Sequence, residues 1–175
     1  SKNPRSTVAT VTEIYDYMRV LYARAGTPFS PFTGKAITSQ TITQIVDLVK
    51  KLPKKSTIYI YAPVVRGRKG EYRKDILSYK RRGFRKIKID NVLYDIEKSP
   101  NLDKKLKHDI SILVDRIVLN SKLGNRLAES IETAVNLSNG LVFVEYEDET
   151  LPQKFRKTEK LIYSTKFACP ESGFT

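Results

Sequence analysis

The sequence predicts an α+β fold: a split β-α-β-β-α-β module with an antiparallel sheet, inserted after an N-terminal helical segment. Apolar residues recur at three- and four-residue spacing over residues 7–25 and 42–52, as they do in amphipathic helices. From Thr57 onward, short runs in which every second residue is apolar alternate with further helical runs. This order of elements is typical of a sheet that carries both of its helices on one face.

The N-terminal segment, residues 1–56, is expected to hold two helices. Ser6 or Thr7 can cap the first helix, because their hydroxyl groups accept hydrogen bonds from the free backbone N–H groups at a helix start. Proline and glycine are frequent between residues 26 and 34, which indicates an irregular loop between the two helices.

The module itself is expected to cover residues 57–147 and to fold as an independent unit. Its first strand is predicted to end at Pro63, because proline lacks the N–H group that a sheet ladder needs. The later elements are a basic turn at 66–70, a helix at 72–79 closed by Gly83, strands at 87–89 and 92–96, a polar loop at 97–107, a strand at 110–119, a helix at 123–135 and a strand at 141–146.

In the strand at 110–119 the alternation changes phase at Asp115 and Arg116, which predicts a β-bulge at these residues. Residues 148–175 show little periodicity. We expect them to form a return segment that contains one more strand at 161–167 and leads toward a degenerate zinc-knuckle-like turn.

The chain carries a formal net charge of +13, and such a field attracts nucleic acid, an anionic membrane surface or an acidic protein. Charge alone does not choose among these partners. No apolar run approaches the roughly 18 residues that span a bilayer, so we expect a soluble, cytoplasmic protein without membrane contact. The single cysteine, Cys169, excludes an internal disulfide. A start at Ser1 and a single methionine, Met18, are expected for a piece of a longer protein.

No catalytic residue is predicted. The sequence contains neither a Walker A phosphate loop nor a GxGxxG loop, the two familiar patterns that bind nucleotide phosphates. The only histidine, His108, has no evident nucleophile or orienting partner and is expected to lie exposed where a strand begins. The acidic residues are dispersed, so no site for a hard metal ion is predicted.

Two turns, at residues 30–34 and at Cys169, resemble zinc knuckles built on a Cys-Pro-x-Cys-Gly pattern. Only Cys169 supplies sulfur, because Ser30, Thr33 and Ser172 stand at the other ligand positions. A tetrahedral zinc site needs four nitrogen or sulfur ligands. The sequence therefore predicts no zinc site in this chain.

Several longer stretches resemble the first ATPase half of the UvrA family, the excinuclease A subunit of bacterial nucleotide excision repair. They follow the order of that family and span nearly the whole chain. The stretches are Asn3–Ile14, Leu21–Gly26, Ala62–Glu71, Val114–Arg116, Arg126–Ala134 and Phe167–Pro170.

The resemblance implies a parent protein that is an ABC-type ATPase, forms a homodimer, scans DNA for lesions and loads UvrB. It implies that residues 1–56 flank the ATPase domain and that the module at 57–147 is the UvrB-docking domain. ATP and zinc are implied as cofactors of the parent protein, whereas this chain is expected to bind no cofactor and to be a monomer. Ser30, Thr33 and Ser172 depart from the family, in which many members have cysteine at these positions.

The candidate partner-binding surface lies on the face of the sheet without helices. In the strand at 87–89 the alternation sends the isoleucines inward and leaves Lys86 and Lys88 on this open face. Arg116, at the predicted bulge, is expected to point outward beside these lysines, with Asp115 next to it. The resemblance implies that Lys86, Lys88, Arg116 and Asp115 meet UvrB.

The alternative is a nucleic-acid-binding domain, in which Arg66, Arg68 and Lys69 of the basic turn contact DNA phosphates. Proteins that bind single strands interleave exposed aromatic and basic residues, and here only Tyr59 and Tyr61 flank a strand. The basic residues of the sheet face and those of the basic turn can also be interpreted simply as solvent-exposed charges without a binding role. An independent enzyme is not favoured, because no nucleophile and base can be assembled.

Overall fold

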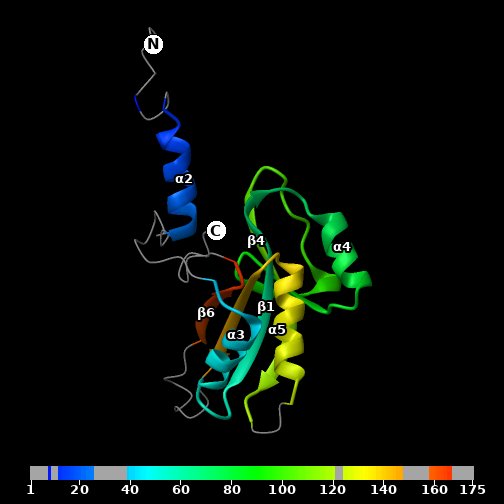
Figure 1. The fold of residues 1–175 in the computed structure, drawn as a ribbon. Helices are drawn as coiled ribbons and strands as arrows, with labels where there is room; N and C mark the ends of the chain where they lie inside the picture. The colour runs from blue at the N-terminus through cyan, green and yellow to red at the C-terminus, as the bar shows by residue number, and fades with distance from the viewer. Residues whose placement is uncertain (1–7, 9–11, 26–38, 121–123, 148–157, 167–175) are drawn as a thin grey trace.

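The computed structural model describes residues 8, 12–25, 39–120, 124–147 and 158–166, and it shows an α+β fold on one six-stranded antiparallel sheet (Figure 1). The strands are β1 (Thr57–Lys69), β2 (Lys86–Ile89), β3 (Val92–Asp95), β4 (Lys107–Val118), β5 (Leu141–Glu147) and β6 (Thr158–Ser164). The helices are α2 (Ile14–Ala25), α3 (Ile42–Lys50), α4 (Arg73–Arg81), α5 (Arg126–Leu137) and the short 3-10 helix η1 (Ile96–Lys98). The predicted fold class is confirmed.

The strand order β3-β2-β4-β1-β5-β6 contains the predicted split βαβ arrangement. β1 and β2 run parallel with β4 between them, and α4 connects them along the chain. β4 and β5 likewise run parallel with β1 between them, and α5 connects them. Because crossovers between parallel strands are right-handed, both connecting helices lie on the same face of the sheet.

The hydrophobic core lies between this sheet and the helices α3 and α5, which cross the same face (Figure 1). From α5, Leu127 and Ile131 are fully buried, and they meet the fully buried Ile58 and Ile60 of β1. Burial of a side chain of this size contributes about 1.5–3 kcal/mol to stability. This face of the sheet is therefore dry, and the opposite face has no described helix to cover it.

The segments on either side of residues 57–147 also take part in this core. α3 begins with a capping box, in which the Thr41 hydroxyl accepts from the Gln44 N–H at 3.2 Å and the Gln44 side chain accepts from the Thr41 N–H at 2.9 Å. α3 then buries Ile45 and Val49 completely. β6, in the predicted return segment, pairs with β5. Independent folding of residues 57–147 stays a prediction.

β1 is longer than predicted, because Pro63 does not end the strand, which continues to Lys69. The ladder between β1 and β5 stops at the pair of Tyr61 and Phe143, so from Pro63 onward β1 pairs with β4 only. The β1–β4 register also shifts between Pro63 and Val65. A bulge on a strand with one neighbour tolerates a residue without an N–H group.

The predicted basic turn at 66–70 is consequently mostly the end of β1, and this prediction was wrong. A further register shift lies between Val65 and Arg68. There, Gly67 has a φ of +56° and donates its N–H to Asp109 Oδ1 at 2.7 Å. Glycine takes this left-handed conformation without strain, so the strand is bent and not interrupted.

The predicted β-bulge in β4 is present but lies one residue earlier. Two neighbouring residues of β1, Ile60 and Tyr61, pair with residues of β4 that are two positions apart. The extra residue is Val114, and not Asp115 or Arg116. Paired residues point to the same face of a sheet, so Asp115, opposite Ile60, lies on the helix-covered face and Arg116 lies on the open face.

His108 is buried, with 6% of its surface exposed, so the expectation of an exposed residue was wrong. Its Nδ1 lies 2.8 Å from Asp90 Oδ2, and its Nε2 lies 2.9 Å from the carbonyl oxygen of Asp103. Both partners accept hydrogen bonds, which favours the doubly protonated ring. The hydrogen bond to Asp90, and then the one to Asp103, raise the pKa of His108. The ring thereby ties the loop before β4 to the turn between β2 and β3.

α2 covers Ile14–Ala25 within the helix predicted at 7–25. Apolar side chains of its predicted stripe, Ile14, Met18 and Leu21, are between 44% and 61% exposed. The described side chains of the stripe are therefore solvent-exposed in this chain, and none of them belongs to the core around the sheet.

Several predictions concern residues outside the described ranges: the cap at Ser6 or Thr7, the loop at 26–34 and the knuckle-like turn at Cys169. In the part of the chain that is described, no helix is long and apolar enough to cross a membrane. No three His, Cys, Asp or Glu side chains of these residues form a group that could hold a metal ion.

Candidate functional site

The open face of the sheet brings together residues from five strands. Every second side chain of a strand lies on the same face, and the strand registers show which ones share it. We call this set the open-face cluster; its members are Lys88 of β2, Ser111 and Arg116 of β4, Tyr59 and Tyr61 of β1, Phe143 and Glu145 of β5, and Lys160 and Ile162 of β6.

Each aromatic ring of the open-face cluster is in contact with a cation. The pairs and their distances from cation to ring centroid are Arg116 on Tyr59 at 5.8 Å, Lys88 on Tyr61 at 4.7 Å and Lys160 on Phe143 at 3.9 Å. The negative face of an aromatic ring attracts a cation at such distances. The rings therefore hold the cations in place and leave little ring area on which a nucleic-acid base could stack.

Lys88 lies on the open face and forms an ion pair with Glu145 of the same chain. Its Nζ donates to both carboxylate oxygens of Glu145, at 2.7 and 2.5 Å, and the two side chains are only 20% and 13% exposed. Charge-assisted hydrogen bonds of this length fix both groups. Burial, and then the Glu145 carboxylate, raise the pKa of the Tyr61 hydroxyl beside them.

Lys86 lies at the edge of the open face and is far more accessible than Lys88. Its Nζ is 3.1 Å from Asp95 Oδ1 on β3, and the two side chains are 49% and 52% exposed. A surface ion pair of this kind contributes about 0–1 kcal/mol. Lys86 can therefore exchange Asp95 for a carboxylate of a partner at little cost.

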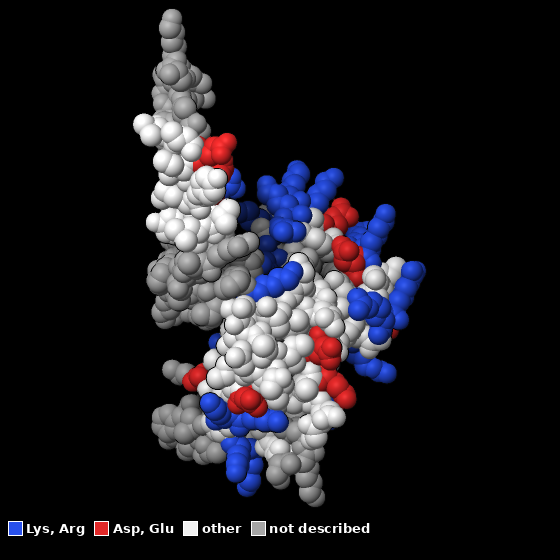
Figure 2. Space-filling view, viewed as in Figure 1, with Lys and Arg blue, Asp and Glu red and all other residues white. Residues whose placement is uncertain are grey.

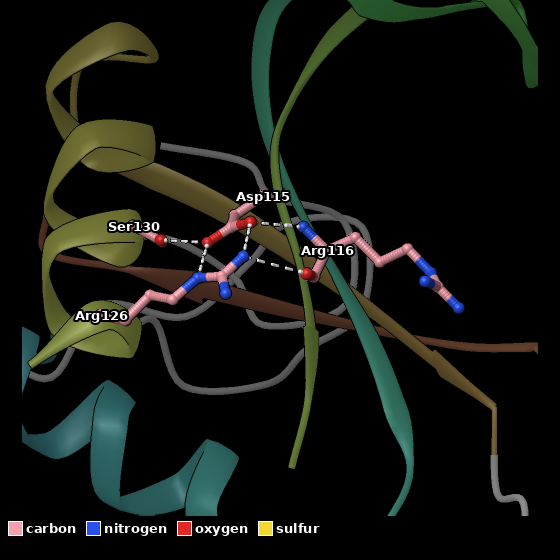
Figure 3. Close-up of polar contacts among 4 residues, drawn as sticks. All are labelled: Asp115, Arg116, Arg126 and Ser130. Carbon is pink, nitrogen blue, oxygen red and sulfur yellow. Dashed lines mark hydrogen bonds and ion pairs between the residues drawn. The ribbon is translucent and has the colours of Figure 1, made fainter. Parts of the chain in front are cut away.

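Asp115 lies between β4 and α5, on the helix-covered face (Figure 3). Its Oδ2 accepts from Ser130 Oγ and Arg126 Nε, each at 2.9 Å. Its Oδ1 accepts from Arg126 Nη2 and from the Arg116 backbone N–H, each at 2.8 Å. Burial acts to raise the pKa of the Asp115 carboxyl, but these hydrogen bonds outweigh it and hold the pKa below its ordinary value.

This network fixes the backbone of Arg116 while the side chain points elsewhere. Asp115 accepts the N–H of Arg116, and Arg126 Nη2 donates to its carbonyl oxygen at 3.4 Å. The Arg116 guanidinium extends away from the network (Figure 3), and its Nε donates to the Tyr59 hydroxyl at 3.4 Å. Among the four sequence candidates, Asp115 thus holds Arg116 in position and is not itself directed to the open face.

The candidate contacts to DNA phosphates, Arg66, Arg68 and Lys69, lie exposed along the end of β1. Lys and Arg also occur at several places on the helix-covered side of the molecule, with Asp and Glu between them (Figure 2). Positive charge is therefore distributed over more than one face. The open face differs because three cations lie on rings of neighbouring strands there, whereas elsewhere single arginines lie over rings, Arg82 over Tyr79 and Phe84 and Arg19 over Tyr15.

Phe143, Glu145 and Lys160 are members of the site that the sequence did not single out. A signal existed for the first two, because apolar alternation in the strand at 141–146 places Val142 and Val144 inward and the residues between them outward. Lys160 has no such signal, since its segment shows little periodicity.

Residues 40–148 match the family model described as the UvrA interaction domain. This chain belongs to the UvrA interaction domain family. The matched range starts just before α3 and ends just after β5, so it includes the helix-covered core and most strands that form the open face. The resemblance to UvrA found in the sequence is confirmed.

Full-length relatives of this interaction domain carry the name UvrABC system protein A. Those of Bradyrhizobium diazoefficiens and Mesorhizobium japonicum are each 52% identical, over 187 and 186 residues, which is 100% of this chain and 19% of each relative. That of Rickettsia typhi is 48% identical over 176 residues, 99% of this chain and 18% of the relative. The chain thus spans about 19% of the length of the relatives it matches first.

Proposed function

We propose that this chain is the UvrB-docking module of a UvrABC system protein A, that it serves bacterial nucleotide excision repair in the cytoplasm, and that UvrB binds to the open face. The observation that supports this most is the set of cations held on the one face of the sheet that no described helix covers. Lys86 and Arg116 are exposed at the edge and in the middle of this face. The family description, an interaction domain, agrees with a docking role.

Protein docking fits this surface because its charged groups are already ordered. Arg116 is fixed through its backbone by Asp115 and through its side chain by Tyr59. A side chain that is ordered before binding loses less conformational entropy when a partner arrives. Fixed cations also speed encounter with an acidic surface and set the register of the complex.

Contact with DNA phosphates is the second candidate function. Arg66, Arg68 and Lys69 are exposed together at the end of β1, and the chain has a formal net charge of +13. Such binding would be independent of sequence and would weaken steeply with salt concentration.

On the same resemblance, we propose that the parent protein is a homodimeric ATPase that binds DNA, ATP and zinc, and that this chain neither binds nor hydrolyses ATP. The residues present here do not fit a zinc site. Cys169 is the only sulfur among the four knuckle positions, and the hydroxyl groups of Ser30, Thr33 and Ser172 are not ligands of structural zinc.

The test of docking uses Lys86→Ala and Arg116→Ala, singly and together, titrated with purified UvrB. We expect the double variant to bind more than about tenfold more weakly, because tenfold corresponds to about 1.4 kcal/mol and each lost pair with a desolvated acid costs more than that. A matched control, Lys74→Ala with Arg81→Ala on α4, removes the same charge from the other side of the molecule.

Thermal unfolding of every variant should match that of the parent chain, so that a change in affinity reports the contact itself. The proposal is wrong if the double variant and the α4 control bind UvrB within about twofold of each other, a difference too small for a lost charged contact. DNA titrated over a salt series decides the second candidate: loss of binding in an Arg66→Ala and Arg68→Ala variant would support it.

A further inference from the structure

A hollow of about 310 Å³ lies on the open face, and five strands contribute to its lining. Tyr61, Lys88, Phe143, Glu145 and Lys160 are among the residues that line it. Its volume is at the lower end of the roughly 300–1,000 Å³ that small-molecule sites occupy. It is large enough for the end of one side chain and its hydrating water.

Charge in this hollow is unevenly paired. Lys88 donates to both oxygens of Glu145 and forms an ion pair with it. Lys160 lies opposite Glu145 in the β5–β6 register. In the part of the chain that the structure describes, its ammonium is in contact with the Phe143 ring at 3.9 Å and makes no ion pair with a carboxylate.

The surroundings of Lys160 disfavour its charge. Loss of solvent around the ammonium lowers the pKa of Lys160, and the positive charge of Lys88 acts in the same direction. Glu145 and Asp109 act in the opposite direction without cancelling the effect. An additional carboxylate in the hollow would stabilise the ammonium, and Lys160 is exposed, so it lies within reach of a partner.

We propose that this hollow receives a carboxylate side chain of the docked protein, and that the carboxylate pairs with Lys160 of β6. The proposal rests on the proposed function, since the occupant belongs to the same partner. A protein carboxylate fits better than nucleic acid, because the rings of Tyr61 and Phe143 already hold lysine ammonium groups and leave little ring area on which a base could stack.

The docking surface then extends beyond residues 57–147. Lys86 of β2 and Arg116 of β4 form one part of it, and Lys160 adds a contact from the strand on the opposite edge of the sheet. A chain that ends at residue 147 would lack this contact even if it folds.

The test measures the affinity of the 175-residue chain for UvrB after Lys160→Met, Lys160→Arg and the control Lys74→Met. Methionine keeps the length and apolar contact over Phe143 and removes the charge. We expect about tenfold weaker binding for Lys160→Met, affinity close to the parent for Lys160→Arg, and a change within about twofold for Lys74→Met. Equal affinities for Lys160→Met and Lys74→Met would overturn the proposal.

A second measurement identifies the occupant directly. Carbodiimide joins an amine to a carboxylate that is in contact with it, and mass spectrometry locates the bond. We expect a cross-link between Lys160 and an Asp or Glu of UvrB, which disappears in Lys160→Arg because a guanidinium does not react. If Lys86 is cross-linked and Lys160 is not, the hollow is not a contact.

The outcomes separate this proposal from the docking proposal. If the parent chain binds UvrB and only the Lys86 and Arg116 variants weaken binding, docking stands and the role of Lys160 is wrong. If the parent chain does not bind UvrB, both are wrong. If Lys160→Met weakens binding to DNA and leaves binding to UvrB unchanged, the occupant is a phosphate and not a protein carboxylate.

Discussion

On the helix-covered face of the sheet, Asp115 is enclosed by donors from α5 and from its own strand, whereas one residue later Arg116 lies on the open face beside the Tyr59 ring. The carboxylate is part of the scaffold, because it accepts four hydrogen bonds from α5 and from the backbone of its own strand. The guanidinium is displayed, because Arg116 is exposed on the face of the sheet that no described helix covers. Neighbouring charged residues thus have opposite roles.

The same contrast holds for the apolar residues of β1. Ile58 is fully buried under α5, and Tyr59 is partly exposed on the open face, where it supports Arg116. Stability is therefore concentrated on one face of the sheet and candidate recognition on the other. Successive side chains of each strand point to opposite faces of the sheet. A substitution at one residue of a strand therefore changes one face, and a substitution at the next residue changes the other.

The largest effect is expected for Ile58→Ala compared with Tyr59→Ala. Removing Ile58 leaves a cavity under α5 and should lower the free energy of unfolding by about 2–5 kcal/mol. Removing Tyr59 should cost about 1 kcal/mol of stability and should weaken UvrB binding through Arg116. Urea denaturation and titration with UvrB measure the two effects. Equal losses of stability would contradict the division between the faces.

An intermediate effect is expected for Asp115→Asn. The amide cannot replace the charged hydrogen bonds to Arg126 and Ser130, and the exposed position of Arg126 reduces the loss, so we expect a decrease of about 1–2 kcal/mol in the free energy of unfolding. Affinity for UvrB should fall as well, because the backbone of Arg116 is less firmly held. The control is Asp47→Asn, an exposed acid on α3.

The pH dependence of this contribution has a definite sign. The pKa of Asp115 is lower in the folded chain than in the unfolded chain. Its stabilising effect is therefore complete above the unfolded value of about 3.9 and is lost as the pH falls through the folded pKa. A profile of stability in this acidic range that is the same for Asp115→Asn and the parent chain would rule out the assigned role.

The smallest effect is expected at His108, which lies near the start of β4 and is not part of the open-face cluster. Its pKa is raised in the folded chain, first by the hydrogen bond to Asp90. Its contribution is therefore complete below the unfolded value of about 6.5 and is lost as the pH rises through the folded pKa. The denaturation midpoint of the parent chain should fall over this range relative to that of His108→Gln. Parallel midpoints for the two proteins would contradict the prediction.

The secondary structure could be predicted wherever periodicity was strong. The alternation around Ile87 and Ile89 and the helical spacing of Leu127 and Ile131 each led to an element of the predicted type. Pro63 was wrongly expected to end the first strand, because proline lacks the N–H group that a sheet ladder needs. The strand continues because the β1–β4 register shifts next to Pro63, and the sequence does not reveal this shift. His108 was misjudged because Asp90 and the Asp103 carbonyl reach it from other loops.

The site could be predicted only in part, for a similar reason. Lys86, Lys88 and Arg116 do lie on the open face, since alternation within one strand determines the face of each side chain. The position of Asp115 depends on a bulge that lies at Val114, one residue from where the phase change was expected. A shift of one residue moves a side chain to the other face.

The sequence by itself determined the family, the α+β class and the inward or outward direction of most side chains, because these depend on residue order and on short-range periodicity. Only the tertiary structure decided which charges are partners. Lys88 and Glu145 are 57 residues apart in the chain, and Lys160 reaches Phe143 only because β6 pairs with β5. Periodicity is a property of one segment, whereas an ion pair or a cation on a ring requires that two segments have been brought side by side by the fold.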